Sequence, residues 1–110
     1  MSRHIHASMM DVLGLPEGKR AHRFIRLQRE DFFAPDGRSD DYTVLEINLM
    51  EGRAPETRRR LIKGLFERFE QQLGISPVDL EITLFESPPC NWGFRGVVGD
   101  EASLDYEIKV

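Results

Sequence analysis

The feature that most constrains this chain is a strand, helix and strand in succession between residues 44 and 86. Residues 44–49 alternate apolar and polar side chains, as a strand with one buried face does, and residues 80–86 repeat that alternation. Between them, apolar side chains recur at helical spacing over residues 55–73. Two strands joined by a helix of this length pair in parallel through a right-handed crossover. The pattern therefore predicts a βαβ unit.

The central helix has recognisable ends and one apolar face. Pro55 suits its first turn, because the N–H that proline lacks is not needed there, and Glu56 complements the positive end of the helix dipole. Gly74 follows its last periodic residue, where a helix commonly stops. The stripe expected to pack on the sheet consists of Leu61, Ile62, Leu65, Phe66, Phe69 and Leu73.

A second and shorter unit precedes this one. Residues 2–13 have apolar side chains at helical spacing, and residues 23–28 read as a short strand. Leu13-Gly14-Leu15-Pro16 parallels Leu73-Gly74-Ile75-Ser76, so each sequence closes a helix and leads to a strand. We therefore predict one α+β domain over residues 1–110. Its first half-repeat, residues 1–42, is incomplete because it has no leading strand, and its second half-repeat spans residues 43–110.

The composition and charge of the chain argue against several classes of function. The net charge of −4 and the pI of about 5.4 argue against a general nucleic-acid binder, which is normally basic. Cys90 is the only cysteine, so no internal disulfide can form, which fits a reducing compartment such as the cytoplasm. No apolar run approaches the roughly 20 residues that span a bilayer. His4 and His6 do not face each other on a helix. We therefore expect no metal, no cofactor and no membrane or nucleic-acid partner.

The last third of the chain combines turns, aromatic rings and a late strand. Residues 87–99 are rich in proline and glycine, yet they also hold Trp92 and Phe94, which are costly in a loop without a packing or binding role. Residues 104–110 alternate apolar and polar side chains up to the last residue. Chain ends fray unless they are docked, so this segment is expected to pair with a neighbouring subunit.

Three motifs, in this order and spacing, resemble the two-repeat members of the tautomerase superfamily. They are Glu51-Gly52-Arg53, Gly74-Ile75-Ser76-Pro77-x-Asp79 and Asn91-Trp92-Gly93-Phe94-Arg95-Gly96. The chain is similar to proteins related to malonate semialdehyde decarboxylase and 4-oxalocrotonate tautomerase. The resemblance implies βαβ repeats with two helices on one face of a mixed sheet, and a homotrimer. It also implies isomerase chemistry without a cofactor: keto–enol tautomerisation, or a related decarboxylation, of small keto or enol carboxylic acids.

The resemblance further assigns the site residues. In that family the catalytic group is the amine of an N-terminal proline at the start of the first strand. Here Pro16 is the first proline, and Met1 falls where the family is already inside its first helix, so residues 1–110 contain no matching catalytic residue. Arg53 matches an arginine that holds the substrate carboxylate, and Trp92 and Phe94 match aromatic residues of the pocket. Lys19 stands where the decarboxylase has an aspartate, and Glu51 stands where it has an arginine.

Two functions follow from these observations. The chain is an enzyme whose true start lies upstream by one strand and a turn, about 18 residues, or it is a catalytically inactive tautomerase-fold protein with a binding or structural role. Plainer interpretations of single residues also stand: Arg53 pairs with Glu51 or Glu56, and Trp92 and Phe94 belong to a core or an interface. Arg95 points either at the site or at a neighbouring subunit, with the second favoured, and Arg58-Arg59-Arg60 is a solvated helix face.

Overall fold

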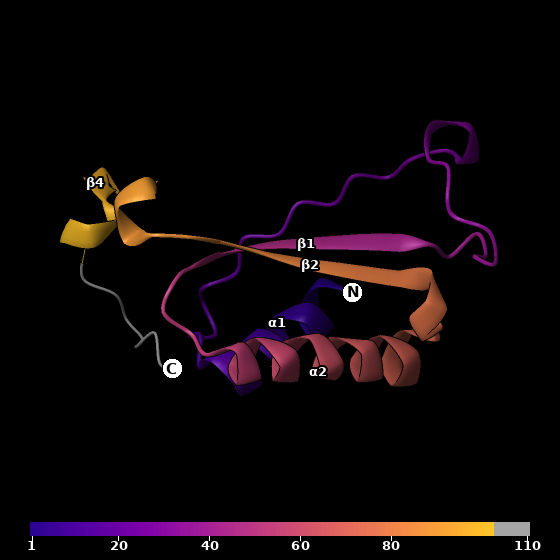
Figure 1. Ribbon diagram of the computed structural model, residues 1–110, viewed down its shortest axis with the longest axis horizontal. Helices are drawn as coiled ribbons and strands as arrows, with labels where there is room; N and C mark the ends of the chain where they lie inside the picture. Colours follow the sequence, from indigo (N-terminus) through magenta and orange to yellow (C-terminus); the bar gives the residue numbers. More distant parts are fainter. Residues whose placement is uncertain (103–110) are drawn as a thin grey trace.

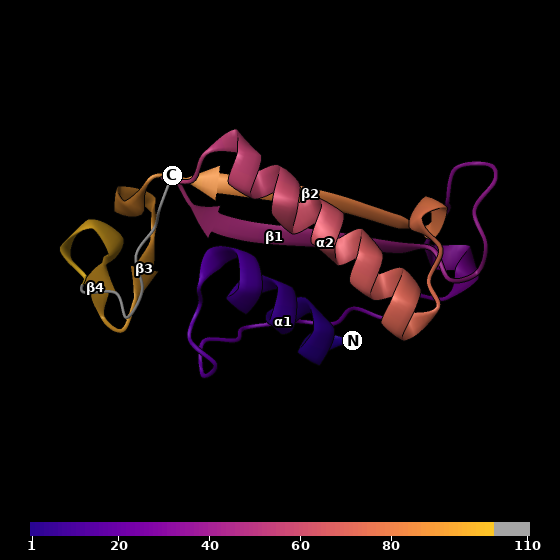
Figure 2. The same ribbon diagram turned by 90° about the horizontal axis from the view of Figure 1, so that it is seen from below.

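The computed structural model describes residues 1–102 and places two helices on one face of a parallel pair of strands (Figure 1). The helices are α1 (Ser2–Leu13) and α2 (Pro55–Leu73). The strands are β1 (Thr43–Met50) and β2 (Leu80–Ser87), and a small antiparallel hairpin of β3 (Gly93–Phe94) and β4 (Val97–Val98) follows. Figure 2 shows α2 crossing beneath both strands while α1 lies beside it. The predicted α+β class and the two helices on one face are confirmed.

Strands β1 and β2 pair in parallel over their whole length. The register runs from Thr43 opposite Leu80 to Met50 opposite Ser87, and α2 forms the crossover. Within β1, Ile47 and Leu49 are buried against the helices while Glu46 and Asn48 are exposed. The alternation in the sequence therefore sets which face of the sheet the helices cover.

The core forms where the helices meet the sheet. Leu61, Leu65 and Phe69 of α2 are completely buried, and they contact a matching stripe on α1 made of Ile5, Met9 and Leu13. Both helices end at a glycine in the left-handed region, Gly14 and Gly74. After α2, the Ile75 N–H donates to the Phe69 carbonyl at 3.1 Å, which closes the helix as its sequence predicts.

The strand predicted at residues 23–28 is wrong, because the structure gives this segment no strand pairing. Phe24 and Ile25 lie 52% and 74% exposed, and the segment runs as extended chain beside α1. A strand requires a neighbour to complete its hydrogen-bond ladder, and none of the described residues provides one here. The mixed sheet that the resemblance implies is represented in residues 1–102 by β1 and β2 alone.

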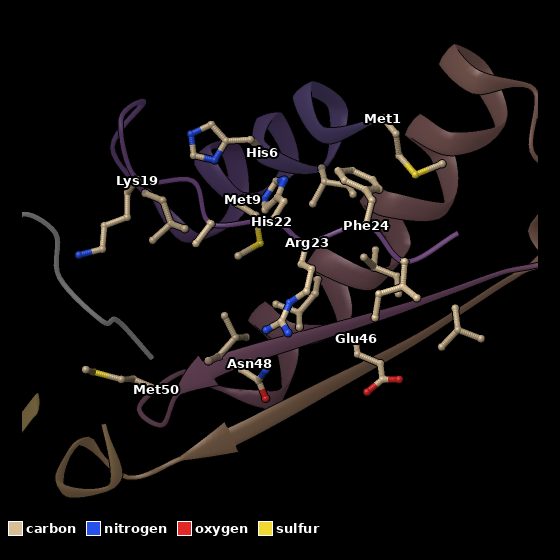
Figure 3. Close-up of a pocket in the computed structure, with 18 of the residues that line it drawn as sticks. Met1, His6, Met9, Lys19, His22, Arg23, Phe24, Glu46, Asn48 and Met50 are labelled. Atoms are coloured by element: carbon tan, nitrogen blue, oxygen red, sulfur yellow. The ribbon is translucent and has the colours of Figure 1, made fainter. Parts of the chain in front are cut away.

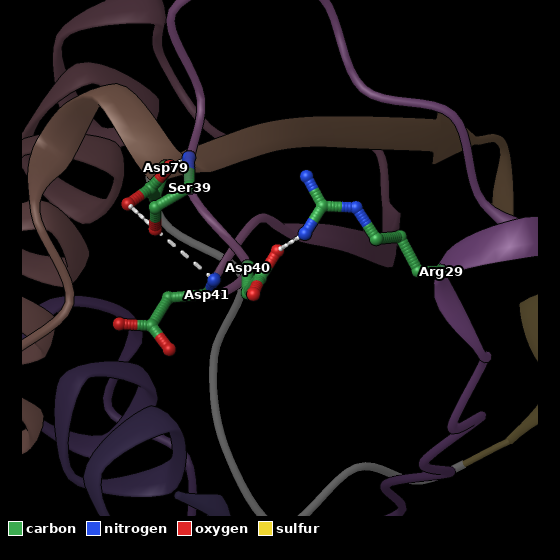
Figure 4. A network of polar contacts seen from close by, with 5 residues as sticks. All are labelled: Arg29, Ser39, Asp40, Asp41 and Asp79. Atoms are coloured by element: carbon green, nitrogen blue, oxygen red, sulfur yellow. Dashed lines mark hydrogen bonds and ion pairs between the residues drawn. The ribbon is translucent and has the colours of Figure 1, made fainter.

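A long loop, residues 29–42, leads to β1. It is fixed at the end of the sheet where both strands begin. Ser39 donates two hydrogen bonds to Asp79, which precedes β2, and the Arg29 guanidinium pairs with Asp40 (Figure 4).

The predicted strand at residues 104–110 lies outside the described residues. Within residues 1–102, neither helix combines the length and apolar character needed to cross a membrane.

Candidate functional site

An elongated pocket of about 880 Å³ runs along the edge of β1 that faces away from β2. We call it the β1 groove. One wall consists of all eight residues of β1, and the other consists of α1 together with residues 19–25 (Figure 3). The described residues give β1 only β2 as a partner, so its backbone groups along the groove remain available for pairing.

All three substrate-binding residues predicted from the sequence line this groove. Arg53 comes from the turn between β1 and α2, Trp92 from the turn before β3, and Phe94 from β3 itself. Arg53 follows the last residue of β1 by three positions, and Figure 1 shows the β3–β4 hairpin beyond the end of the sheet where β1 finishes. Residues separated by about 40 positions in the sequence thus meet because the parallel crossover returns the chain to the same end of the sheet.

The Arg53 side chain is buried, with 6% of its surface exposed, yet it has no acidic partner among the described residues. Pairing with Glu51 or Glu56 is therefore not found, and Glu56 instead lies 3.4 Å from Arg59. Within residues 1–102, the hydrogen bond that this guanidinium donates goes to the Met50 carbonyl, at 3.2 Å. A guanidinium has five N–H donors, so most of them are left to face an anion in the groove.

Aromatic rings and further cations form the rest of this end. The Lys19 Nζ lies 5.5 Å from the centroid of the Phe94 ring, and the Arg95 Cζ lies 5.2 Å from it. The Trp92 indole N–H donates to the Ser87 carbonyl at 3.3 Å, which holds the ring at the end of β2. Gly99 packs so closely on this turn that an added Cβ would lie 2.4 Å from the Pro89 carbonyl oxygen.

The charge of the groove is strongly asymmetric. Four cationic side chains line it, against the single carboxylate of Glu46 among the described lining residues; the four are Lys19, Arg23, Arg53 and Arg95. Figure 3 shows Arg23 pointing from its segment into the groove, toward β1. The sequence analysis did not single out Arg23 or Asn48, because alternation along a strand does not reveal which pocket a polar side chain will face. Such a groove favours an anionic ligand.

Two histidines stand in the wall that α1 forms with the following loop. His6 Nε2 donates to the Glu17 carbonyl at 2.8 Å, which leaves Nδ1 as an acceptor, buried and without a partner in the described part of the chain. His22 Nδ1 lies 2.7 Å from the Ser2 hydroxyl, and its ring meets His6 edge to face. Burial, with help from His6 and Arg20, lowers the pKa of His22 below its ordinary value.

Other residues considered in the sequence lie away from this groove. Arg59, Arg60 and Cys90 are exposed on the surface. Within residues 1–102, no cluster of three or more histidine, cysteine or acidic side chains has the arrangement of a metal site. The groove is lined by a buried guanidinium and by aromatic rings, and a guanidinium can bind a carboxylate at two points and stabilise negative charge developing next to it.

Comparison with known families identifies the family of this chain. A family model described as "Tautomerase enzyme" matches residues 19–95, which include Arg53, Trp92 and Phe94. The chain belongs to the tautomerase family. A probable tautomerase of Bacillus subtilis (strain 168), YusQ, is 24% identical over 99 residues, covering 86% of this chain and 78% of that protein.

Solved structures confirm the tautomerase fold. Malonate semialdehyde decarboxylase superposes with a TM-score of 0.76 at 24% identity, covering 84% of this chain and 75% of the other. A fused 4-OT asymmetric trimer superposes with a TM-score of 0.78 at 17% identity, covering 89% of this chain and 80% of the other. A member of the cis-3-chloroacrylic acid dehalogenase family superposes with a TM-score of 0.77 at 16% identity, covering 88% of this chain and 68% of the other. Tautomerase, decarboxylase and dehalogenase thus share the architecture of this chain.

Proposed function

We propose that this tautomerase-family chain catalyses keto–enol tautomerisation of small keto or enol carboxylic acids. The observation that carries the proposal is the buried Arg53, which has no acidic partner in the described residues and lines the same groove as Trp92 and Phe94. A guanidinium in this setting would hold the substrate carboxylate and stabilise the enolate that forms during proton transfer. The aromatic rings would cover the apolar part of the substrate.

The proton would be moved by the amine of an N-terminal proline on a strand that lies in the β1 groove. Such a strand would pair with β1, and its first residue would reach Arg53 if it ran antiparallel to β1. An α-amine ordinarily titrates near 8, and the cations at this end of the groove would lower that pKa. A neutral amine could then accept a proton from carbon near pH 7.

Two residues favour tautomerisation over the decarboxylation of malonate semialdehyde. The resemblance places an aspartate in the decarboxylase where this chain has Lys19, and Lys19 stacks on Phe94 at the mouth of the groove. It places an arginine where this chain has Glu51, which is exposed. A site without that aspartate and without a second arginine lacks the groups that the family uses for water activation and for carboxylate binding.

We also infer that the chain is a single domain that works as a homotrimer in the cytoplasm, without a metal or other cofactor. Support for assembly comes from the fused 4-OT trimers that share its fold. The single cysteine fits a reducing compartment, and the acidic net charge argues against nucleic-acid partners.

The proposal is tested by comparing two proteins: residues 1–110 alone, and the same residues preceded by an extended, alternating segment that begins with proline. Ketonisation of the enol of phenylpyruvate should be rapid only in the second. Arg53→Ala should then lower the rate by about 10²–10³, or about 2.7–4 kcal/mol of barrier, while Arg59→Ala, on the exposed helix face, should have little effect. Turnover by residues 1–110 alone that is lost in Arg53→Ala would show that a different base works in this groove.

A further inference from the structure

Arg58 differs from its two arginine neighbours on α2. The side chain of Arg59 is 65% exposed and its charge meets Glu56, one turn away on the same helix. The side chain of Arg58 is only 30% exposed and turns toward the end of β2. The expectation that all three arginines form a solvated face is therefore wrong for Arg58, whose partner lies 28 residues away in the sequence.

The Arg58 guanidinium joins three parts of the fold at the end of the β1 groove. Its Nη1 donates to the Arg53 backbone carbonyl at 2.9 Å and to the Glu86 Oε1 at 2.6 Å. Glu86 lies on β2 directly opposite Leu49 of β1. One nitrogen atom thus links α2, β2 and the turn that presents Arg53.

We propose that Arg58 and Glu86 are positioning residues for Arg53, a role that builds on the proposed function of the groove. Among residues 1–102, the Arg53 side chain is held by one hydrogen bond, to the Met50 carbonyl three residues earlier. The hydrogen bond from Arg58 to the Arg53 carbonyl fixes the orientation of the Arg53 backbone. It thereby fixes the direction in which the Arg53 guanidinium enters the groove. The Glu51 N–H bond to the Ser87 carbonyl, at 2.9 Å, secures the same turn from the β1 side.

The charges of the pair suit this role. Glu86 neutralises Arg58, so the second guanidinium does not compete with Arg53 for an anion, and no carboxylate of residues 1–102 compensates the charge of Arg53. A planar guanidinium can also donate to two fixed acceptors with little loss of side-chain freedom, which lysine cannot match. The Oε2 of Glu86 is buried and has no partner among the described residues. Removing Arg58 would therefore leave a carboxylate without its counter-charge.

The test uses Arg58→Gln, Arg58→Lys and Glu86→Gln, with Arg59→Gln as the matched control from the same helix. In the chain bearing a prolyl strand, Arg58→Gln should raise KM and lower kcat/KM by up to about 100-fold, the scale of a misplaced binding group. Arg58→Lys should recover thermal stability, because the charge returns, but should not recover KM. Glu86→Gln should give a smaller rise in KM, since an amide oxygen still accepts a hydrogen bond. Arg59→Gln should change none of these quantities.

A second measurement is independent of turnover. The ¹⁵N resonance of the Arg53 Nε–H reports whether this buried guanidinium is fixed, and titration with malonate reports whether it binds a carboxylate. Arg58→Gln should broaden the resonance, accelerate its hydrogen exchange and weaken malonate binding. If every variant changes stability but leaves the Arg53 resonance, malonate affinity and KM as in the wild type, the positioning role is wrong. If the wild-type chain fails to bind malonate, the proposed function is overturned, and the exchange rate of Arg53 still decides the role of Arg58.

Discussion

At the scale of single residues, Asp79 shows how one buried carboxylate ties a long loop to the sheet. It is 5% exposed and accepts hydrogen bonds from the Ser39 N–H at 2.7 Å and from the Ser39 hydroxyl at 2.6 Å (Figure 4). These bonds favour the ionised form and lower the pKa of Asp79 below its ordinary value. The loop that leads to β1 is thereby anchored beside the start of β2, 40 residues further along the chain.

This lowered pKa predicts an acid-sensitive contribution to stability. Because the folded pKa is below the unfolded value of about 3.9, the contribution is complete above that pH and is lost as the pH falls through the folded pKa. Asp79→Asn should lower the melting temperature at pH 7, and the gap to wild type should close toward pH 3. The exposed Asp36, changed to Asn, should leave the melting temperature nearly unchanged. A gap for Asp79→Asn that stays constant from pH 7 to pH 3 would contradict the assignment.

At the scale of elements, the stability of α2 depends on the few side chains that meet the sheet. Phe69 is completely buried between the helices and the strands. Phe69→Ala should lower the free energy of unfolding by about 3–5 kcal/mol, because it removes apolar contacts and leaves a cavity. Phe33→Ala, at a ring 88% exposed on the loop, should change it by less than about 0.5 kcal/mol. Both are measured by urea unfolding, and a loss below about 1 kcal/mol for Phe69→Ala would mean that this face is misassigned.

The helices and the two parallel strands could be predicted from the sequence because their signals are local. Pro55 and Gly74 mark the ends of α2, and alternation marks both strands within one or two residues of their observed limits. The prediction of a strand at residues 23–28 was wrong because strand pairing is not a local property. Its apolar residues, Phe24 and Ile25, suggested a strand, but a ladder needs a partner, and no local pattern records which partner is present.

The same distinction applies to the groove. Arg53, Trp92 and Phe94 could be named because their motifs resemble a known family, and the fold brings them to one pocket. Arg58 was missed because its helical position suggested solvent, while its actual partner, Glu86, is determined by how α2 crosses β2. The cation Arg23 was missed likewise, since its direction depends on the course of an extended segment without regular structure.

At the scale of the whole molecule, the proposed function depends on one edge of the sheet. The described residues leave the outer edge of β1 beside a cationic groove and leave Phe24 and Ile25 exposed on the opposite wall. An unpaired strand edge attracts another strand. The proposed prolyl strand would complete this edge and place its amine at the end where Arg53 stands, so that the sheet and the active site would be completed together.

The last prediction concerns assembly. Residues 104–110 lie outside the described residues, and their alternation of apolar and polar side chains predicts a strand that docks on a neighbouring chain. A segment donated from each chain to the next is a head-to-tail contact, which closes into a ring when the rotation between chains allows it. Light scattering should therefore show a particle of about three 12.7-kDa chains. The paired change Leu104→Ser with Ile108→Ser should dissociate it, because both side chains belong to the apolar face, whereas Asp105→Ser with Glu107→Ser should leave it intact. A trimer that persists after residues 103–110 are deleted would show that a different surface holds the chains together.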